Sequence, residues 1–222
     1  MDWEALSLSL RLGAWTTVIL IPSGILLARV LAWRRFPGRG AVEALVALPL
    51  VLPPTVLGYY LLAAFGGGSA FGRGYQALFG SPLAFSFEGL LLASLVFNLP
   101  FAIQPMQRAF AGIAPELREA AWCSGLSRWQ AFRRVELPLA FPGVLSAAVL
   151  TFAHTLGEFG VVLMVGGNLP GQTKTIAIAI YDRVQAFDDA GAALMSATLV
   201  LISFAAIVAI HGLTGRRDRV RV

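Results

Sequence analysis

Charged side chains are scarce in this chain, and their scarcity excludes most classes of soluble protein. Of the 222 residues, 13% are charged and 57% are hydrophobic, whereas a soluble globular domain carries about 25% charged residues. Most of the surface is therefore expected to face something other than water. Sulfur chemistry is equally limited, because the single cysteine, Cys123, can form no disulfide within the chain, and one thiol does not make a metal site. We interpret Cys123 as a small packing residue.

Long uncharged apolar segments recur five times along the chain. A helix needs about 20 apolar residues to cross the hydrocarbon core of a bilayer, and each segment meets or approaches that length. The first is not expected to be a cleaved signal peptide, because Asp2 and Glu4 give the residues before it the wrong charge. We predict an all-α, polytopic membrane protein with a single transmembrane domain over residues 1–222. Its helices are expected at 8–33, 42–65, 87–107, 138–165 and 189–213.

The basic residues are distributed unevenly between the two sides of the predicted spans. Most of the 17 lie at positions 29–39, 108–134 and 216–221, which fall on one side of a protein with five spans. The remainder are Arg11, Arg73, Lys174 and Arg183. Because cytoplasmic loops are enriched in Lys and Arg, we expect the amino terminus outside and the carboxyl terminus in the cytoplasm. The net charge of +5 then reflects topology and contact with anionic membrane lipid, not nucleic-acid binding.

Two outer loops and one proline-rich segment add detail to this topology. The Gly-rich loop 66–86 is expected to be mobile, with one short helix near 75–79. Residues 175–184 form an apolar patch too short to cross a bilayer, and we predict an interfacial or re-entrant helix there. Within the second span, residues 48–54 contain three prolines, which kink helices. The kink fits either a bent packing helix or a flexible point in the wall of a pathway.

Between the third and fourth spans, residues 113–137 predict two short cytoplasmic helices. Pro115 suits the first turn of a helix, and Ser124-Gly125 provide its end. Ser127 is expected to cap the second helix, and Leu137-Pro138 to stop it where the next span begins. The residues alone fit either an amphipathic pair lying on lipid headgroups or an element that approaches a partner protein closely.

The fourth predicted span carries polar side chains on one helical face. Their spacing of i, i+3, i+4 and i+7 places on that face Thr151, His154, Thr155 and Glu158. Ionisable groups at membrane depth face a bundle interior or a water-filled path, so these four are candidate pathway or gate residues; interhelical hydrogen bonding is the simpler interpretation. His154 and Glu158 lack the third ligand of a metal site. No nucleophile motif accompanies His154, and we predict neither a metal site nor a catalytic residue.

Residues 166–175 resemble a phosphate-binding loop only superficially. Gln172 and Thr173 separate Gly171 from Lys174, whereas a Walker A sequence has Lys directly after its last Gly and follows a strand. Here a predicted membrane span precedes the loop, and the predicted topology puts it outside. The chain is therefore expected to bind no ATP of its own.

The helix pair at 113–137 resembles the EAA signature of permease subunits of binding-protein-dependent ABC importers. The matching residues are Glu119-Ala120-Ala121, Gly125 and Leu137-Pro138, with Val135 where the signature has Ile. The resemblance implies a type I importer permease fold, in which this loop docks into a cleft of the ATPase subunit. By position, Glu119, Ala120, Ala121 and Gly125 would inherit the docking role. Leu137 and Pro138 would inherit the return into the membrane.

Three further blocks resemble the molybdate branch of that family. They are residues 48–60, 155–160 and 166–182; sulfate permeases look similar in the last two, and the first favours molybdate, with tungstate carried alike. The resemblance implies a homodimer in the cytoplasmic membrane of a bacterium, working by alternating access. It also implies two cytoplasmic ATPase subunits that bind ATP and magnesium, and an extracytoplasmic molybdate-binding protein.

Other kinds of membrane protein compete with this interpretation. A sulfate or thiosulfate permease is the nearest alternative. An ion-coupled secondary transporter commonly has internal repeats and buried acids, but no repeat is visible and only Glu158 is available. A membrane enzyme such as an intramembrane protease would need the missing nucleophile motif. We therefore predict a transport subunit, not an enzyme, that binds no cofactor itself.

Overall fold

The structure is a computed structural model that describes residues 1–218, with side chains described up to residue 208. Every regular element in residues 1–218 is helical. In chain order the helices are α1 (Trp3–Trp33), α2 (Arg39–Val51), α3 (Pro54–Phe65), α4 (Ala70–Phe79), α5 (Phe87–Ala111), α6 (Pro115–Cys123), α7 (Arg128–Ala131), α8 (Leu137–Gly157), α9 (Gly160–Gly166), α10 (Ile176–Gln185) and α11 (Asp189–Asp218). A π-helical turn, η1 (Phe132–Glu136), joins α7 to α8. Of the predicted basic tail, Arg219 and Arg221 lie outside the described residues.

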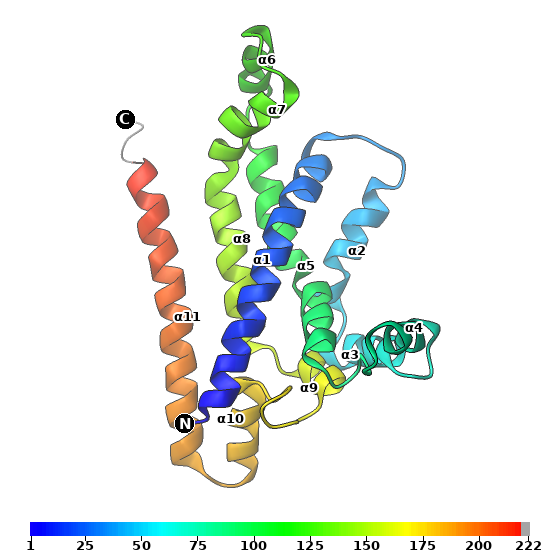
Figure 1. Ribbon diagram of the computed structural model, residues 1–222. Coiled ribbons are helices and arrows are strands. Elements are labelled where there is room, and N and C mark those ends of the chain that lie inside the picture. The colour runs from blue at the N-terminus through cyan, green and yellow to red at the C-terminus, as the bar shows by residue number, and fades with distance from the viewer. Residues whose placement is uncertain (219–222) are drawn as a thin grey trace.

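Three long helices form the central frame (Figure 1). α1 packs along both α5 and α8, and α5 packs along α8. The largest buried apolar cluster takes Leu31 from α1, Met106 and Phe110 from α5, and Val144 from α8. Gly143 of α8 permits the close approach to α5, because a Cβ there would lie 2.3 Å from the Cβ of Ala109. This frame fixes the positions of the shorter helices at its two ends.

Four helices are long and apolar enough to cross a membrane, and the bent pair α2–α3 could supply a fifth span. This number is consistent with the five spans predicted from the sequence. α1 begins at Trp3, earlier than predicted, because the side chain of Asp2 accepts a hydrogen bond from the N–H of Ala5 at 3.0 Å and caps the helix. α5 and α11 each run past the predicted ends, residues 107 and 213, by about one turn.

The second predicted span, 42–65, is wrong as a single kinked helix. α2 and α3 are separate helices, and their axes differ by 112° across the break. Leu52 and Pro53 adopt extended backbone, with ψ of 137° and 135°. A residue that precedes a proline is disfavoured in the helical region, and two prolines in succession extend this restriction over both residues. α3 therefore turns away from α2 and packs on α9 (Figure 1).

The fourth predicted span, 138–165, is also divided. α8 ends at Gly157, and Glu158 has extended backbone with φ of −71° and ψ of 131°. The chain then forms the short helix α9, whose first residue, Gly160, lies against Pro54 of α3. The apolar run is continuous in sequence, but its last quarter belongs to a different helix that packs on α3 and α5.

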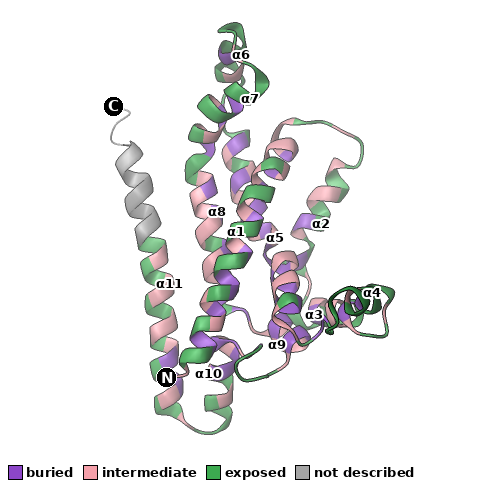
Figure 2. Cartoon of the chain, in the orientation of Figure 1, coloured by how far each residue is buried: buried purple, intermediate pink, exposed green. Residues whose placement is uncertain are grey.

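Short helices gather at the end of the molecule that contains the amino terminus (Figure 1). The helix predicted near 75–79 is confirmed as α4, which starts earlier, at Ala70. The predicted short helix at 175–184 is confirmed as α10. It is joined to α1 because the Oγ of Ser9 accepts a hydrogen bond from the N–H of Ile176 at 2.8 Å. At the opposite end α6 and α7 project beyond the long helices and are largely exposed (Figure 2).

Candidate functional site

The projecting element consists of α6, a tight turn and α7, as the sequence predicts. Pro115 occupies the first turn of α6. Gly125 follows the helix with φ of +80°, and its N–H donates to the carbonyl of Trp122 while the N–H of Leu126 donates to that of Ala121. This pair of bonds is the Schellman arrangement, which needs a left-handed residue and favours glycine. The chain therefore reverses within a few residues.

A reciprocal cap then starts α7. The Oγ of Ser127 accepts from the N–H of Gln130 at 3.2 Å, and the side chain of Gln130 accepts from the N–H of Ser127 at 2.9 Å. Both orphan N–H groups at the helix start are satisfied in this capping box. The predicted capping role of Ser127 is confirmed, and together with Gly125 it gives the helix pair a defined shape.

The predicted coupling residues do not all face the same way. Glu119, Ala120 and Gly125 are exposed at the tip, where their surfaces are available to another molecule. Ala121 is buried, with 7% of its surface exposed, so its methyl group packs inside the chain. Around the exposed residues lie large apolar side chains that are open to solvent. They are Leu117, Trp122 and Trp129.

Leu137 and Pro138 do not stop the second helix, contrary to the sequence prediction. α7, η1 and α8 form one continuous helix from Arg128 to Gly157. Inside it, the N–H of Leu137 donates to the carbonyl of Phe132, five residues back. Pro138 has no N–H to donate, and it falls in the first turn of α8 directly after the wider turn. No loop therefore separates α7 from α8.

A buried charged residue that the sequence analysis did not single out is Glu136, in the π-helical turn. Its side chain is fully buried, yet it accepts from Nε of Arg29 at 2.6 Å and from Nε of Arg118 at 3.3 Å. Arg29 belongs to α1 and Arg118 to α6. Charge-assisted bonds of this kind are among the stronger polar contacts in proteins. Glu136 therefore ties the projecting helix α6 and the long helix α1 to the start of α8.

Aromatic rings enclose this ion cluster. The guanidinium of Arg118 lies 3.7 Å from the centre of the Trp33 ring and 5.2 Å from that of Trp122. Cation–π contacts add to the attachment of α6. The only sequence signal was an acid directly before Leu137-Pro138, at the start of a long apolar segment. Its partner Arg29 is 107 residues away, so spacing could not reveal the contact.

The polar stripe of α8 takes part in a hydrogen-bonded chain across the three central helices. His154 Nδ1 lies 3.0 Å from Oδ1 of Asn98 on α5, and the His154 ring stacks on Phe101. The Nδ2 of Asn98 donates to the Oγ of Ser94 at 3.2 Å, and the hydroxyl of Thr16 on α1 donates to the same oxygen at 3.1 Å. The sequence analysis did not single out Asn98 or Ser94, although they are polar residues one turn apart in an apolar segment.

The other members of the stripe are buried. Thr155 donates its hydroxyl to the backbone carbonyl of Thr151 at 2.8 Å. The hydroxyl of Thr151 and both carboxylate oxygens of Glu158 are buried without a hydrogen-bond partner among the described residues. Glu158 is 5% exposed and sits where α8 gives way to α9. Within the part of the chain that the structure describes, no three His, Cys, Asp or Glu residues are grouped as metal ligands.

The loop between α9 and α10 is held by charged and amide groups. Nζ of Lys174 lies 2.6 Å from Oδ2 of Asp182, and the amide of Asn168 donates to the same carboxylate. Partial burial disfavours ionisation of Asp182, but the hydrogen bonds from Lys174 and Asn168 outweigh it and hold the pKa of this carboxyl below its usual value. Lys174 is thus engaged within the chain, and the loop has a defined structure.

Comparison with known proteins identifies similar sequences over nearly the whole chain. The family described as "Binding-protein-dependent transport system inner membrane component" matches residues 21–219. The molybdenum transport system permease protein ModB of Azotobacter vinelandii is 46% identical over 210 residues, which cover 95% of this chain and 93% of that protein. The sulfate transport system permease protein CysT of Escherichia coli (strain K12) is 32% identical over 196 residues, covering 88% of this chain and 70% of that protein.

The fold is also found in a solved structure. The crystal structure of a bacterial ABC transporter involved in the import of the acidic polysaccharide alginate matches with a TM-score of 0.77 at 18% identity. The match covers 96% of this chain and 78% of the other. At this identity the likeness concerns the fold alone, and it places the projecting helix pair and the central helices within a known architecture.

Proposed function

This chain belongs to the family of binding-protein-dependent transport system inner membrane components, a family of ABC importer permease subunits, and we propose that it carries molybdate across the cytoplasmic membrane of a bacterium. The choice of molybdate as the substrate rests on the 46% identity to a molybdenum transport permease over 95% of this chain. Tungstate, a tetrahedral oxyanion of the same charge, is carried by the same path.

The working unit is a homodimer with two cytoplasmic ATPase subunits and an extracytoplasmic molybdate-binding protein. The amino terminus lies outside and α6 and α7 face the cytoplasm, in line with the basic residues that flank them. ATP and magnesium are bound by the ATPase subunits. Their closure on ATP opens the path to the outside, and hydrolysis returns the path to the inside.

Motion enters through the helix pair α6–α7. Glu119, Ala120 and Gly125 contact the ATPase at the exposed tip, while Ala121 supports them from within. Leu137 and Pro138 lie in the continuous helix that carries the movement into the membrane. Glu136 joins the same movement to α1 through Arg29. The movement is thereby transmitted to two long helices of the central frame, α8 and α1.

The polar residues of α8 serve as gate groups. Thr151, His154 and Thr155 lie along the helix that the ATPase moves, and Glu158 lies at the break where this helix ends. An acid repels an oxyanion, so Glu158 is assigned to gating and not to substrate binding. The helix is interrupted next to this buried acid, and at this interruption α8 and α9 can shift relative to each other.

We predict that replacing Glu158 with Gln stabilises the subunit while impairing transport. The carboxylate is buried with no partner among the described residues, and such burial costs free energy, so the free energy of unfolding should rise by about 1 kcal/mol. Uptake of molybdate per ATP hydrolysed should fall. Thermal unfolding in detergent and uptake into proteoliposomes measure the two effects.

The matched control for this prediction is Glu88→Gln, which neutralises an exposed acid at the same end of the molecule. It should change neither property. Lower thermal stability of Glu158→Gln would show that the carboxylate is needed for packing, and a changed preference among oxyanions would show that it contacts substrate. Either result would contradict the gating role.

A sulfate permease is the second candidate function, favoured by the 32% identity to a sulfate transport permease. The test uses the permease–ATPase complex in liposomes, once with the molybdate-binding protein and once with the sulfate-binding protein of the same bacterium. Molybdate is expected to stimulate ATP hydrolysis and to be taken up, whereas sulfate at the same concentration is not. Stimulation by sulfate alone would replace molybdate as the substrate, and stimulation by neither would reject oxyanion import.

A further inference from the structure

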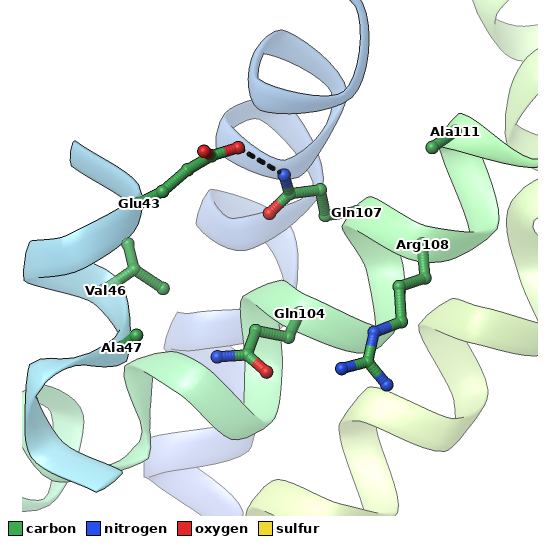
Figure 3. A pocket seen from close by; sticks show the side chains of 7 residues that line it. All are labelled: Glu43, Val46, Ala47, Gln104, Gln107, Arg108 and Ala111. Atoms are coloured by element: carbon green, nitrogen blue, oxygen red, sulfur yellow. Dashed lines mark hydrogen bonds between the residues drawn. The ribbon is translucent and has the colours of Figure 1, made fainter. Parts of the chain in front are cut away.

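A pocket with a mixed polar and apolar lining lies between α2 and α5, toward the end of the molecule from which α6 and α7 project (Figure 3). Its volume is about 330 Å³, enough for a small anion together with several waters, since each water occupies about 30 Å³ in the liquid. Glu43 of α2 and Gln104, Gln107 and Arg108 of α5 supply its polar lining. None of these residues was a candidate from the sequence.

The pocket lies on a face of α5 that the central frame leaves uncovered. Ile103 and Met106 face Gly24 of α1, and Ala109 faces Gly143 of α8. Gln104 and Arg108 are one turn apart and so share a different face. Figure 3 views α5 from that side, with α1 behind it. Arg108 is exposed and Gln104 is partly exposed, so a ligand can reach both.

The acid in the pocket is already engaged, while strong donors remain free. Glu43 accepts from the amide of Gln107 at 2.8 Å and from Arg39 at 3.1 Å. These contacts hold the carboxylate of Glu43 at the α2 side of the pocket. The guanidinium of Arg108 and the amide of Gln104 form no hydrogen bond or ion pair within the described residues. What the pocket offers a ligand is therefore a positive charge with several N–H donors.

The depth of these groups indicates contact with water. Arg108 lies one turn, and Gln104 about two turns, before the end of α5, a helix long and apolar enough to span the membrane. At the depth of Gln104 a polar side chain faces a protein interior or an aqueous path, because hydrocarbon does not solvate it. The longer side chain of Arg108, near the helix end, can reach the aqueous side of the membrane. An aqueous path on the α2–α5 face accounts for polar side chains that line a pocket in an otherwise apolar helix pair.

We propose that this pocket is an oxyanion site at the inner mouth of the path, where Arg108 and Gln104 bind a doubly charged tetrahedral oxyanion before its release to the cytoplasm. The inference rests on the proposed function and names residues of this chain that contact the transported ion. A guanidinium presents N–H groups in the fork geometry that suits tetrahedral oxyanions. The site is open on one side, so release is not obstructed.

Equilibrium dialysis of the purified permease–ATPase complex, without nucleotide or binding protein, tests the site directly. The probes are radiolabelled molybdate and radiolabelled sulfate. Arg108→Gln is expected to weaken binding by about tenfold or more, as for loss of a charge-assisted hydrogen bond, and Gln104→Leu by less. Arg108→Lys should retain part of the affinity. In proteoliposomes, Arg108→Gln should also slow uptake while the complex remains assembled.

Arg34→Gln is the matched control, because Arg34 is an exposed arginine at the end of α1 that lies outside the pocket. It should bind both probes as the wild type does. Equal weakening by Arg34→Gln would reduce the effect to general surface charge and overturn the site. Unchanged binding in Arg108→Gln, or a wild type that binds neither probe, would overturn it as well. Wild-type uptake of molybdate reports separately on the proposed function, so a wild type that binds and transports only sulfate would correct the substrate and retain the pocket.

Discussion

Replacing Glu136 with Gln is expected to lower the free energy of unfolding by about 3 kcal/mol, because it leaves two arginines facing each other without their buried counter-charge. Glu136 is fully buried, whereas Arg29 and Arg118 keep 28% and 19% of their side chains exposed. Water therefore screens part of the remaining repulsion, and the subunit should still fold in the membrane. Thermal unfolding of the purified subunit measures the loss.

The same substitution should uncouple ATP hydrolysis from transport. Without the carboxylate, α6 loses its ionic link to α1 and keeps the stacking of Arg118 on Trp33, so movement of α6 should reach α1 incompletely. In proteoliposomes, ATP hydrolysis should continue while uptake falls. Glu116→Gln, at an exposed position of the same helix, should leave both unchanged. Normal stability together with normal uptake in Glu136→Gln would refute the linkage.

Replacing Gly125 with Trp is expected to abolish co-purification with the ATPase subunit. Gly125 has φ of +80°, and a side chain there would meet nothing within 4 Å inside the chain. A residue other than glycine costs about 1–2 kcal/mol in this conformation, and its bulk projects only toward the docking partner. Insertion in the membrane should be unaffected, which pull-down of the tagged subunit from solubilised membranes can establish.

Gly38 provides a control that separates backbone strain from docking. It has φ of +85° and open space around it, in the loop between α1 and α2. Gly38→Trp carries a similar strain outside the helix pair and should co-purify with the ATPase normally. Loss of assembly in both variants would attribute the effect to misfolding, and retained assembly in Gly125→Trp would place the docking surface elsewhere.

The sequence predicted those features that depend on neighbouring residues. Gly125 marked the end of α6 and Ser127 the start of α7, because caps and left-handed turns depend on residues close in sequence. The division of the second span was missed, although Pro53-Pro54 pointed to it, since apolarity is continuous through the break. The break at Glu158 was missed for the same reason, and no proline marked it.

Contacts between residues that are distant in sequence could not be predicted from the sequence. Glu136 and Arg29 are ordinary charged residues until the fold brings α1 and α8 together. The pocket beside Arg108 depends on which face of α5 is covered by α1 and α8, and a single apolar segment does not reveal this. The hydrogen-bonded chain from Thr16 to His154 likewise needs three helices to be placed before it can be recognised.

The wide turn at 132–136 sets the angular phase between the two halves of the helix that contains it. One additional residue in a turn rotates everything on one side by about 100° relative to the other. The helix pair α6–α7, which we propose to contact the ATPase, and the residues of α8 that contact α5 therefore hold relative orientations that an uninterrupted α-helix of the same length would not allow. Deletion of a single residue there would leave both halves helical but would rotate the helix pair α6–α7 relative to α8.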